Sequence, residues 1–148
     1  MIIRKAKTSE WEIIAGFQQK MAMETENLSL NMDVVGKGVQ AVFNDPAKGQ
    51  YYVAEKDNQI IATLMITFEW SDWRNSYMPW IQSLYVKQEF RKQGVYKEMY
   101  NYLQEKVRSD SEWPGIRLYV DRSNHAAQKV YSALGMNSDH YVLFEWMK

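Results

Sequence analysis

Cysteine is absent from the 148-residue chain, and histidine occurs only at His125 and His140. The lack of cysteine excludes disulfides, thiolate nucleophiles and cysteine-based metal sites. The two histidines are fifteen positions apart and fit no metal-ligand spacing such as H-E-x-x-H. We therefore expect a protein that uses no metal.

Net charge and long apolar runs are also missing. Lys+Arg and Asp+Glu both number 18, so no overall charge attracts nucleic acid or an anionic membrane. No apolar run approaches the ~18 residues of a membrane helix. Arg4 and Lys5 follow the first three residues too closely for a signal peptide. We expect a soluble, cytoplasmic protein with no nucleic-acid or membrane partner.

The apolar periodicity predicts one α/β domain with a mixed sheet, in the order β-α-α-β-β-β-α-β-α-β. Helical spacing predicts helices from Thr8 or Ser9 to Met23, over residues 33–43, from Gly94 onward, and after Asn124. Two-residue alternation or β-rich composition predicts strands at 1–5, 50–56, 60–70, 80–86, 116–120 and 140–148. A tight turn at Asp57 and Asn58 predicts an antiparallel hairpin.

A basic turn connects the strand "SLYV" to the helix that follows Gly94. Arg91, Lys92 and Lys97 lie near this helix N-terminus, where the helix dipole disfavours positive charge. The unpaired N–H groups there bind anions when a glycine lets the backbone approach closely. A solvated basic turn explains the same residues, and the sequence contains neither a P-loop nor a complete dinucleotide fingerprint.

Two motifs in this chain resemble those of the GNAT superfamily of acyl-CoA-dependent N-acyltransferases. That family's [QR]-x-x-G-x-[GA] signature follows an L-x-V strand, as "RKQGVY" here follows "LYV". Its second signature, N-x-x-A-x-x-x-Y-x-x-x-G-[FM], resembles "NHAAQKVYSALGM". The resemblance implies one N-acetyltransferase domain over residues 1–148, with a mostly antiparallel sheet and about four helices. Tyr96 departs from the pattern, and its side chain must point away from the phosphates.

The resemblance implies that acetyl-CoA is the co-substrate. Backbone N–H groups of residues 92–96 would hold the pyrophosphate, and the strand that ends at Val86 would lie beside the pantetheine arm. The implied cofactor-binding residues are Leu84, Tyr85, Val86, Arg91, Lys92, Gln93, Gly94, Val95, Tyr96 and Asn124.

The same resemblance implies that Tyr131 is the general acid for the departing thiolate, although its place on an apolar helix stripe also suits a core residue. Gln82 stands where many family members have a glutamate base, and an amide cannot accept the proton. We favour Glu26 or Glu24 as the base. Asp72, Glu69, Glu145 and water remain open.

The expected activity is acetyl transfer to a primary amine, on a small molecule, a lysine or a peptide N-terminus, by direct attack of the amine. Four aromatic residues near one loop suit either a core or a wall that contacts a cationic amine: Trp70, Trp73, Tyr77 and Trp80. One alternative is a non-catalytic acyl-CoA sensor, which the glutamine at position 82 favours. Another is a basic-aromatic nucleic-acid surface, which zero net charge disfavours. A homodimer is an open possibility.

Overall fold

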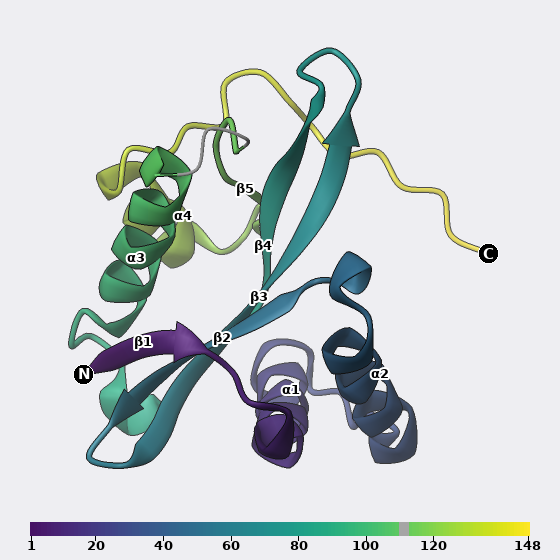
Figure 1. The fold of residues 1–148 in the computed structure, drawn as a ribbon, viewed down its shortest axis with the longest axis vertical. Helices are drawn as coiled ribbons and strands as arrows, with labels where there is room; N and C mark the ends of the chain where they lie inside the picture. The colour runs from purple at the N-terminus through teal and green to yellow at the C-terminus, as the bar shows by residue number, and fades with distance from the viewer. Residues whose placement is uncertain (110–112) are drawn as a thin grey trace. The chain divides into compact units, whose positions relative to one another are not determined.

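A five-stranded sheet in the order β1-β2-β3-β4-β5 organises the first part of the chain (Figure 1). The neighbouring strands β1 to β4 are antiparallel, and β4 and β5 are parallel. The strands are β1 Ile2–Lys5, β2 Gln50–Lys56, β3 Gln59–Ser71, β4 Ser76–Val86 and β5 Arg117–Leu118. The predicted mixed, mostly antiparallel sheet is therefore confirmed.

This computed structural model describes residues 1–109 and 113–148. It consists of two units, Met1–Leu118 and Tyr119–Lys148. Among the described residues, no helix combines the length and apolar character needed to cross a bilayer.

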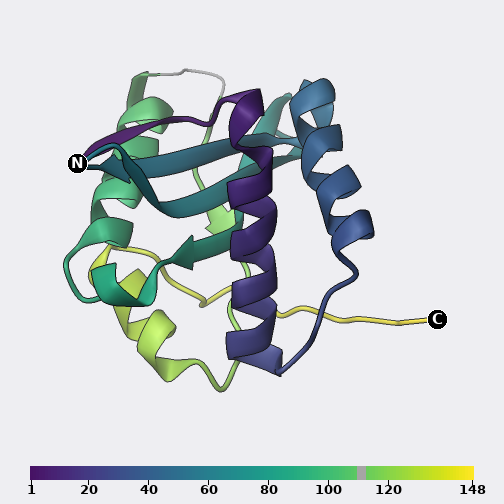
Figure 2. The same ribbon diagram turned by 90° about the horizontal axis from the view of Figure 1, so that it is seen from below.

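Helices cover both faces of the sheet in the first unit. Helices α1 (Trp11–Glu26) and α2 (Met32–Asn44) lie on one face and α3 (Val95–Ser109) on the other (Figures 1 and 2). Successive side chains of a strand point to opposite faces. Accordingly, the Tyr51 ring lies 5.7 Å from that of Phe43 in α2, and the Tyr52 ring lies 5.8 Å from that of Tyr102 in α3.

Local sequence explains where these elements begin and turn. The Asn31 side chain accepts hydrogen bonds from the backbone N–H groups of Asp33 and Val34, which caps α2. Asp57 and Asn58 both adopt positive φ, at 51° and 60°, as a two-residue hairpin turn requires. The predicted turn between β2 and β3 is confirmed. Helix α1 runs three residues past the predicted end at Met23, and a 3₁₀ turn, η1 (Thr8–Glu10), precedes it.

The core of the first unit lies between α1, α2 and the sheet. Ile14 and Phe17 of α1, Val39 of α2 and Val53 of β2 are buried in this core. Burial of such side chains contributes about 1.5–3 kcal/mol each. The helical spacing of Ile14 and Phe17 therefore fixes α1 against β2, β3 and β4, and this contact positions the end of α1.

An ion cluster joins the start of the chain to the sheet. We call Arg4, Glu10 and Glu55 the Arg4 cluster. Arg4 Nη2 lies 2.6 Å from Glu10 Oε1 and 2.5 Å from Glu55 Oε2. Hydrogen bonding to Glu10 raises the pKa of Arg4, despite desolvation, and the hydrogen bond from Arg4 lowers the pKa of Glu10. This cluster connects β1, η1 and β2.

The second unit contains helix α4 (His125–Ala133), which Asn124 caps. Residues 141–148 have no regular secondary structure, so the predicted strand over 140–148 is wrong. Its β-favouring pattern is real, but a strand also requires a neighbour that accepts its backbone hydrogen bonds. The predicted strand at 116–120 is shorter than expected, because only Arg117 and Leu118 are in β5.

Candidate acetyl-transfer site

A bulge interrupts β4 near its end. Thr63 of β3 pairs with Tyr85 of β4, but Met65 pairs with Gln82, so β4 contains one extra residue in this interval. Ser83 takes up the mismatch with a φ of 50°. A bulge of this kind leaves part of the hydrogen-bond ladder unmade and redirects the strand.

The same part of β4 has an open edge. Pairing with β5 is limited to Trp80 with Arg117 and Ile81 with Leu118. From Gln82 to Val86, no strand in the described part of the chain pairs with that side of β4. Its backbone can therefore accept an extended ligand as an added strand.

The turn after β4 leads directly into the N-terminus of α3. The 3₁₀ helix η3 (Gln88–Phe90) is followed by a turn in which Lys92 and Gly94 have φ values of 61° and 79°. Apart from Gly94 and its two neighbours in the chain, no described residue has an atom within 4 Å of the place that a Cβ of Gly94 would occupy. The first N–H groups of α3 have no partner within the helix, so they face an approachable space that suits an anion.

Tyr96 does not obstruct this turn. Its ring lies 6.1 Å from the ring of Tyr100, one helical turn further on. The side chain therefore extends along α3, whereas an anion at the turn would contact backbone N–H groups. Val95 is buried, and the Gln93 side chain donates to the carbonyl of Glu89 at 2.7 Å. The side chains of Gln93 and Val95 are therefore engaged within the chain.

Arg91 is turned toward α1. Its Nε donates to the Val86 carbonyl at 2.8 Å, and its Nη2 lies 2.5 Å from Glu24 Oε2. The guanidinium also lies over the Tyr85 ring, 5.4 Å from its centroid. Lys92 is exposed as well, but among the described residues its ammonium forms no ion pair.

Glu24 is the centre of a cluster that joins α1 to the end of β4. Besides Arg91, Glu24 accepts hydrogen bonds from the Tyr85 hydroxyl at 3.0 Å and from Gln88 Nε2 at 3.1 Å. We call these four residues the Glu24 cluster. Desolvation opposes the charge, but hydrogen bonds from Arg91 and Tyr85 prevail and lower the pKa of Glu24. Desolvation and the bond to Glu24 raise the pKa of Tyr85.

Glu26 lies in a different setting. It is exposed at the end of α1, and its carboxylate makes no hydrogen bond or ion pair with the rest of the described chain. Two residues along a helix correspond to a rotation of about 200°, so Glu24 and Glu26 point in nearly opposite directions. The structure brings Glu24, and not Glu26, to the end of β4.

The other acidic candidates in the first unit have structural contacts. Asp72 accepts from the backbone N–H of Trp73 at 2.9 Å in the turn between β3 and β4. At ~3.3 Å per residue, the distance along β4 from that turn to Ser83 is roughly 20 Å. Asp72 is therefore far from the bulge. Glu69 accepts from Trp80 Nε1 at 2.8 Å, and Gln82 donates to Thr67 Oγ1 at 2.6 Å.

The remaining predicted site residues lie in the second unit. Asn124 Oδ1 accepts from the Ala127 N–H at 3.0 Å, so its oxygen caps α4. Tyr131 is seven residues further on, which is about two turns and places it on the same side of α4. Burial raises the pKa of Tyr131, so this side chain keeps its proton at neutral pH.

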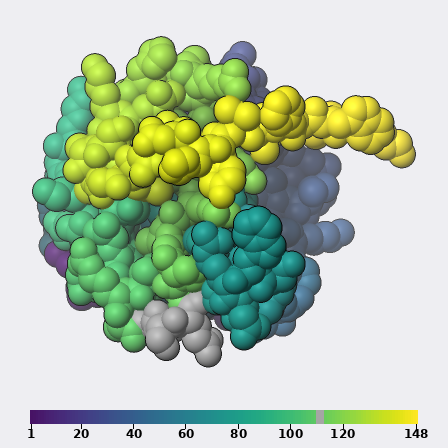
Figure 3. All heavy atoms as spheres, turned by 90° about the horizontal axis from the view of Figure 1, so that it is seen from above, coloured from purple at the N-terminus to yellow at the C-terminus, as the bar shows by residue number. Residues whose placement is uncertain are grey.

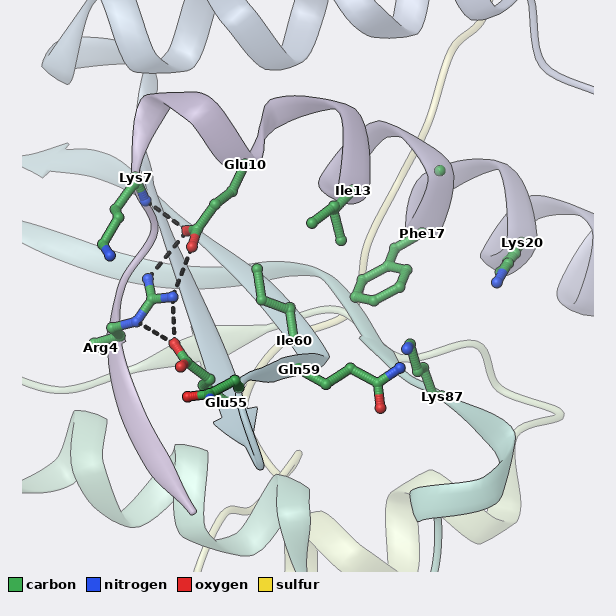
Figure 4. A pocket seen from close by; sticks show the side chains of 12 residues that line it. Arg4, Lys7, Glu10, Ile13, Phe17, Lys20, Glu55, Gln59, Ile60 and Lys87 are labelled. Carbon is green, nitrogen blue, oxygen red and sulfur yellow. Dashed lines mark hydrogen bonds and ion pairs between the residues drawn. The ribbon is translucent and has the colours of Figure 1, made fainter.

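Sequence reasoning missed a separate cavity of about 580 Å³ in the first unit. The Arg4 cluster closes one end, while Ile13, Phe17 and Ile60 supply apolar walls (Figure 4). At the other end lie Lys20 and Lys87, and Lys87 Nζ is 5.9 Å from the Phe17 ring centroid. None of the predicted site residues lines this cavity, and no motif marks it because its walls come from distant segments.

The fold and the strand-turn-helix arrangement agree with comparisons to known proteins. Residues 18–136 match the acetyltransferase (GNAT) family. The chain belongs to this family. No match was found among curated proteins.

Solved structures support the same assignment. A possible acetyltransferase from Clostridium difficile 630 is 39% identical, with a TM-score of 0.93 over 99% of this chain and 97% of that chain. A predicted acetyltransferase from Clostridium acetobutylicum, solved with acetyl-CoA, is 21% identical, with a TM-score of 0.74 over 97% and 95%. An aminoglycoside acetyltransferase from an uncultured soil metagenomic sample, in complex with sisomicin, is 14% identical, with a TM-score of 0.79 over 99% and 95%. The last two likenesses concern the fold alone.

The family assignment confirms the resemblance found in the sequence. In this family member, β4 has a bulge and an open edge. The strand then leads into the turn before α3. Among the described residues, no group of three histidine, aspartate or glutamate side chains could hold a metal ion.

Proposed function

We propose that this chain, as one N-acetyltransferase domain over residues 1–148, transfers an acetyl group from acetyl-CoA to a primary amine. The observation that carries the proposal is the open edge at Gln82–Val86 followed directly by the accessible backbone turn at Gly94. An edge strand suits an extended amide-bearing arm, and a helix N-terminus suits a pyrophosphate. Coenzyme A combines both chemical features, so these residues fit it.

The binding roles follow from the surroundings of each residue. The N–H groups of residues 92–96 and the Lys92 ammonium would hold phosphates. Backbone groups of Leu84 and Val86 would orient the arm, with one N–H polarising the acyl carbonyl. A structural role is proposed for Arg91, Tyr85 and Glu24, because they bond mainly to one another. They would hold the end of β4 and the following turn in place. Asn124 would contribute its amide N–H group to the arm, since its oxygen caps α4.

Acetyl-CoA supplies a thioester, which is an activated acyl donor. The amine nitrogen forms a bond to the acyl carbon as the carbon–sulfur bond breaks, and the sulfur leaves as a thiolate. Tyr131 would donate its hydroxyl proton to that sulfur, since its raised pKa keeps it protonated. The attacking amine loses one proton, so the overall transfer balances.

Removal of the amine proton is the more demanding step. For a lysine-like amine, deprotonation costs about 4.6 kcal/mol at pH 7. Glu24 is committed to Arg91 and Tyr85, and its lowered pKa makes it a weak base. Glu26 points away from Glu24 on α1. These surroundings favour a water molecule as the proton acceptor, with Glu24 as a positioning residue and Glu26 as the remaining carboxylate candidate.

The acceptor is proposed by chemical class as a small-molecule amine or a lysine or N-terminal amine. The exposed aromatic side chains Trp70, Trp73 and Tyr77 lie on the β3–β4 hairpin, roughly 20 Å or more along β4 from Ser83, so they do not bear on the acceptor at this site. The related fold that was solved with sisomicin, an aminoglycoside acetyltransferase, supports an amine acceptor only by analogy of fold.

The test is thiol release from acetyl-CoA with a panel of polyamines, aminoglycosides and peptide amines. Because the chain has no cysteine, every free thiol that a colorimetric reagent detects is product. We expect amine-dependent thiol release together with a rise in melting temperature on addition of acetyl-CoA. If acetyl-CoA produced no stabilisation and no thiol, the proposal would fail.

A non-catalytic acyl-CoA sensor is the second candidate. Gln82 favours it, because its amide is bound to Thr67 and cannot take a proton from an amine. Stabilisation by acetyl-CoA without thiol release from any amine of the panel would support the sensor over the enzyme.

A further inference from the structure

The cavity of about 580 Å³ in the first unit lies between α1 and the start of β3. Ile13, Phe17 and Lys20 are four and three positions apart, so they share one face of α1. Figure 4 shows all three side chains on the side of the helix that faces Ile60 and Lys87. A volume of this size lies within the range of about 300–1,000 Å³ that small-molecule sites occupy.

The cavity is distinct from the candidate acetyl-transfer site. None of its lining residues belongs to the Glu24 cluster or to the turn at Arg91–Tyr96. The end of the β3–β4 hairpin, residues 68–78, which forms the teal group of atoms in Figure 3, does not line it either. A ligand in this cavity would therefore bind apart from acetyl-CoA, whether or not the chain transfers acetyl groups.

Gly16 leaves one wall of the cavity open. It lies in the interior of α1, where glycine costs about 1 kcal/mol relative to alanine. Its φ is not positive, and beyond its own helix backbone and chain neighbours an added Cβ would meet no atom of the described chain within 4 Å. Neither the backbone conformation nor packing within the described chain therefore requires glycine here. The missing side chain gives a ligand access to the backbone surface of α1.

The cavity carries more positive than negative charge. Its lining contains four cations and two carboxylates, and both carboxylates are already bonded to Arg4. Lys20 and Lys87 form no ion pair with any described residue. Lys87 is half-buried, and its Nζ lies 5.9 Å from the Phe17 ring centroid. An ammonium in partly desolvated surroundings is stabilised by an anion that can approach it.

The middle of the cavity is apolar, and the end near Lys87 is polar. Ile13 is 45% exposed, and the buried side chains of Phe17 and Ile60 complete the apolar wall. The Gln59 side chain points toward Lys87 in Figure 4, so amide and ammonium donors converge there. An apolar wall with a few convergent polar groups is typical of small-molecule sites. The ligand that fits has an anionic head and an apolar body.

We propose that this cavity binds a small organic carboxylate. The carboxylate would accept hydrogen bonds from Lys20 and Lys87, with one oxygen for each ammonium. The apolar body of the ligand would lie on Ile13, beside the open wall at Gly16. Inorganic anions fit less well because they would leave the exposed Ile13 uncovered. Amines fit less well because cations without a carboxylate partner already line the cavity.

Calorimetric titration of the full chain with phenylacetate and with 4-methylpentanoate tests the class of ligand. We expect at least one of them to bind saturably, with a dissociation constant at or below about 1 mM. Acetate has the head without the body, and phenethylamine has an apolar body with the opposite charge, so each should bind at least about tenfold more weakly. No saturable binding of either carboxylate, or equal affinity for acetate, phenethylamine or inorganic phosphate, would overturn the proposal.

Two variants locate the bound carboxylate. Lys87→Met removes an ammonium and keeps an apolar stem, and Gly16→Leu fills the open wall without changing any charge. Each should weaken carboxylate binding at least about tenfold, with a urea midpoint that shows a folded chain. The matched controls Lys37→Met and Gly38→Leu lie in α2 outside the cavity and should leave the affinity unchanged. A folded Lys87→Met or Gly16→Leu variant that binds as tightly as its control would overturn the placement of the ligand in this cavity.

Discussion

The Arg4 cluster and the Glu24 cluster use the same chemistry in two regions of the first unit. Each holds an arginine against a glutamate at 2.5–2.6 Å. The Arg4 side chain is 23% exposed and bonds two carboxylates, whereas the Arg91 side chain is 41% exposed and bonds one. Burial strengthens an ion pair and makes its disruption more costly.

The two clusters therefore have different roles. The Arg4 cluster joins β1, η1 and β2, and its loss should weaken the fold. The Glu24 cluster joins the end of α1 to the end of β4 and the turn at Arg91. Its loss should alter the candidate site more than the free energy of unfolding. Variants of the two clusters should therefore differ in whether they lower the free energy of unfolding or alter the candidate site.

The largest effect is expected from Gly94→Glu, which changes the site and leaves both clusters in place. A carboxylate at this helix N-terminus repels phosphates, and Gly94 has a φ of 79° that suits glycine. Calorimetric titration should show acetyl-CoA affinity reduced at least about 100-fold, or about 2.7 kcal/mol.

Gly38→Glu is the matched control for Gly94→Glu. Gly38 lies in α2, and beyond its own helix backbone an added Cβ would likewise meet open space. Its replacement should leave the affinity for acetyl-CoA unchanged. Retained binding by Gly94→Glu would mean that the phosphates lie elsewhere.

Arg4→Met should have the largest effect on stability. It leaves Glu10 and Glu55 close together without their cation, at a cost of about 2–3 kcal/mol in the free energy of unfolding. Urea denaturation measures this loss, and acetyl-CoA affinity should not change. Arg108→Met is the control, because Arg108 pairs with Glu105 on an exposed helix surface, where such pairs contribute about 0.3–0.5 kcal/mol. If both variants lowered the free energy of unfolding equally, the Arg4 cluster would not be a special support of the fold.

Tyr131→Phe asks whether the second unit contributes to catalysis. A thiol has a pKa of about 8.5, so protonation of the leaving group is not difficult. We therefore expect kcat to fall only about tenfold, with the dissociation constant of acetyl-CoA unchanged. Steady-state kinetics and titration distinguish the two quantities. Unchanged turnover would exclude Tyr131 as the acid.

Glu24→Gln should produce a smaller change, mainly in KM. The amide still accepts from Tyr85 but no longer holds the charge of Arg91, so the turn loses an anchor. We expect the KM for acetyl-CoA to rise several-fold, by roughly 1 kcal/mol, with kcat little altered. Glu26→Gln, two residues away, should have neither effect. A large fall in kcat for either variant would instead indicate a general base at that position.

Local pattern was sufficient for most of the fold. The Asp57–Asn58 turn, the Asn124 cap and the helical spacing in α1 are each determined by residues close in sequence. The β4 bulge was not predictable, because Ser83 carries no signal for a positive φ and the bulge arises from register with β3. The prediction of a strand at 140–148 was wrong for a related reason. A strand forms only where a neighbouring strand pairs with it, and the sequence of one segment does not show whether such a neighbour exists.

The candidate site also has one part that local sequence predicts and one part that depends on residues distant in the chain. The turn at Arg91–Tyr96 could be read from its motif, because it uses consecutive backbone groups. The contact of Glu24 with Arg91 joins residues 67 positions apart, so neither residue signals it locally. This is why a carboxylate favoured as a base in the sequence is better explained, with its neighbours in view, as an anchor.

Acid should reveal the smallest difference between the two clusters. The pKa values of Glu10 and Glu24 both lie below their usual value of 4.5, so the unfolded carboxyls bind protons at higher pH than the folded ones. Their contribution to stability is therefore complete above about pH 4.5 and is lost as pH falls through the lowered folded values. Urea midpoints between pH 7 and pH 3 should fall less steeply for Glu10→Gln than for the unaltered chain. Glu24→Gln should flatten the curve less, because its partner Arg91 is more exposed and better screened. If Glu24→Gln flattened the curve as much as Glu10→Gln, the Glu24 cluster would have to be counted as a structural support of the fold as well as an anchor of the turn.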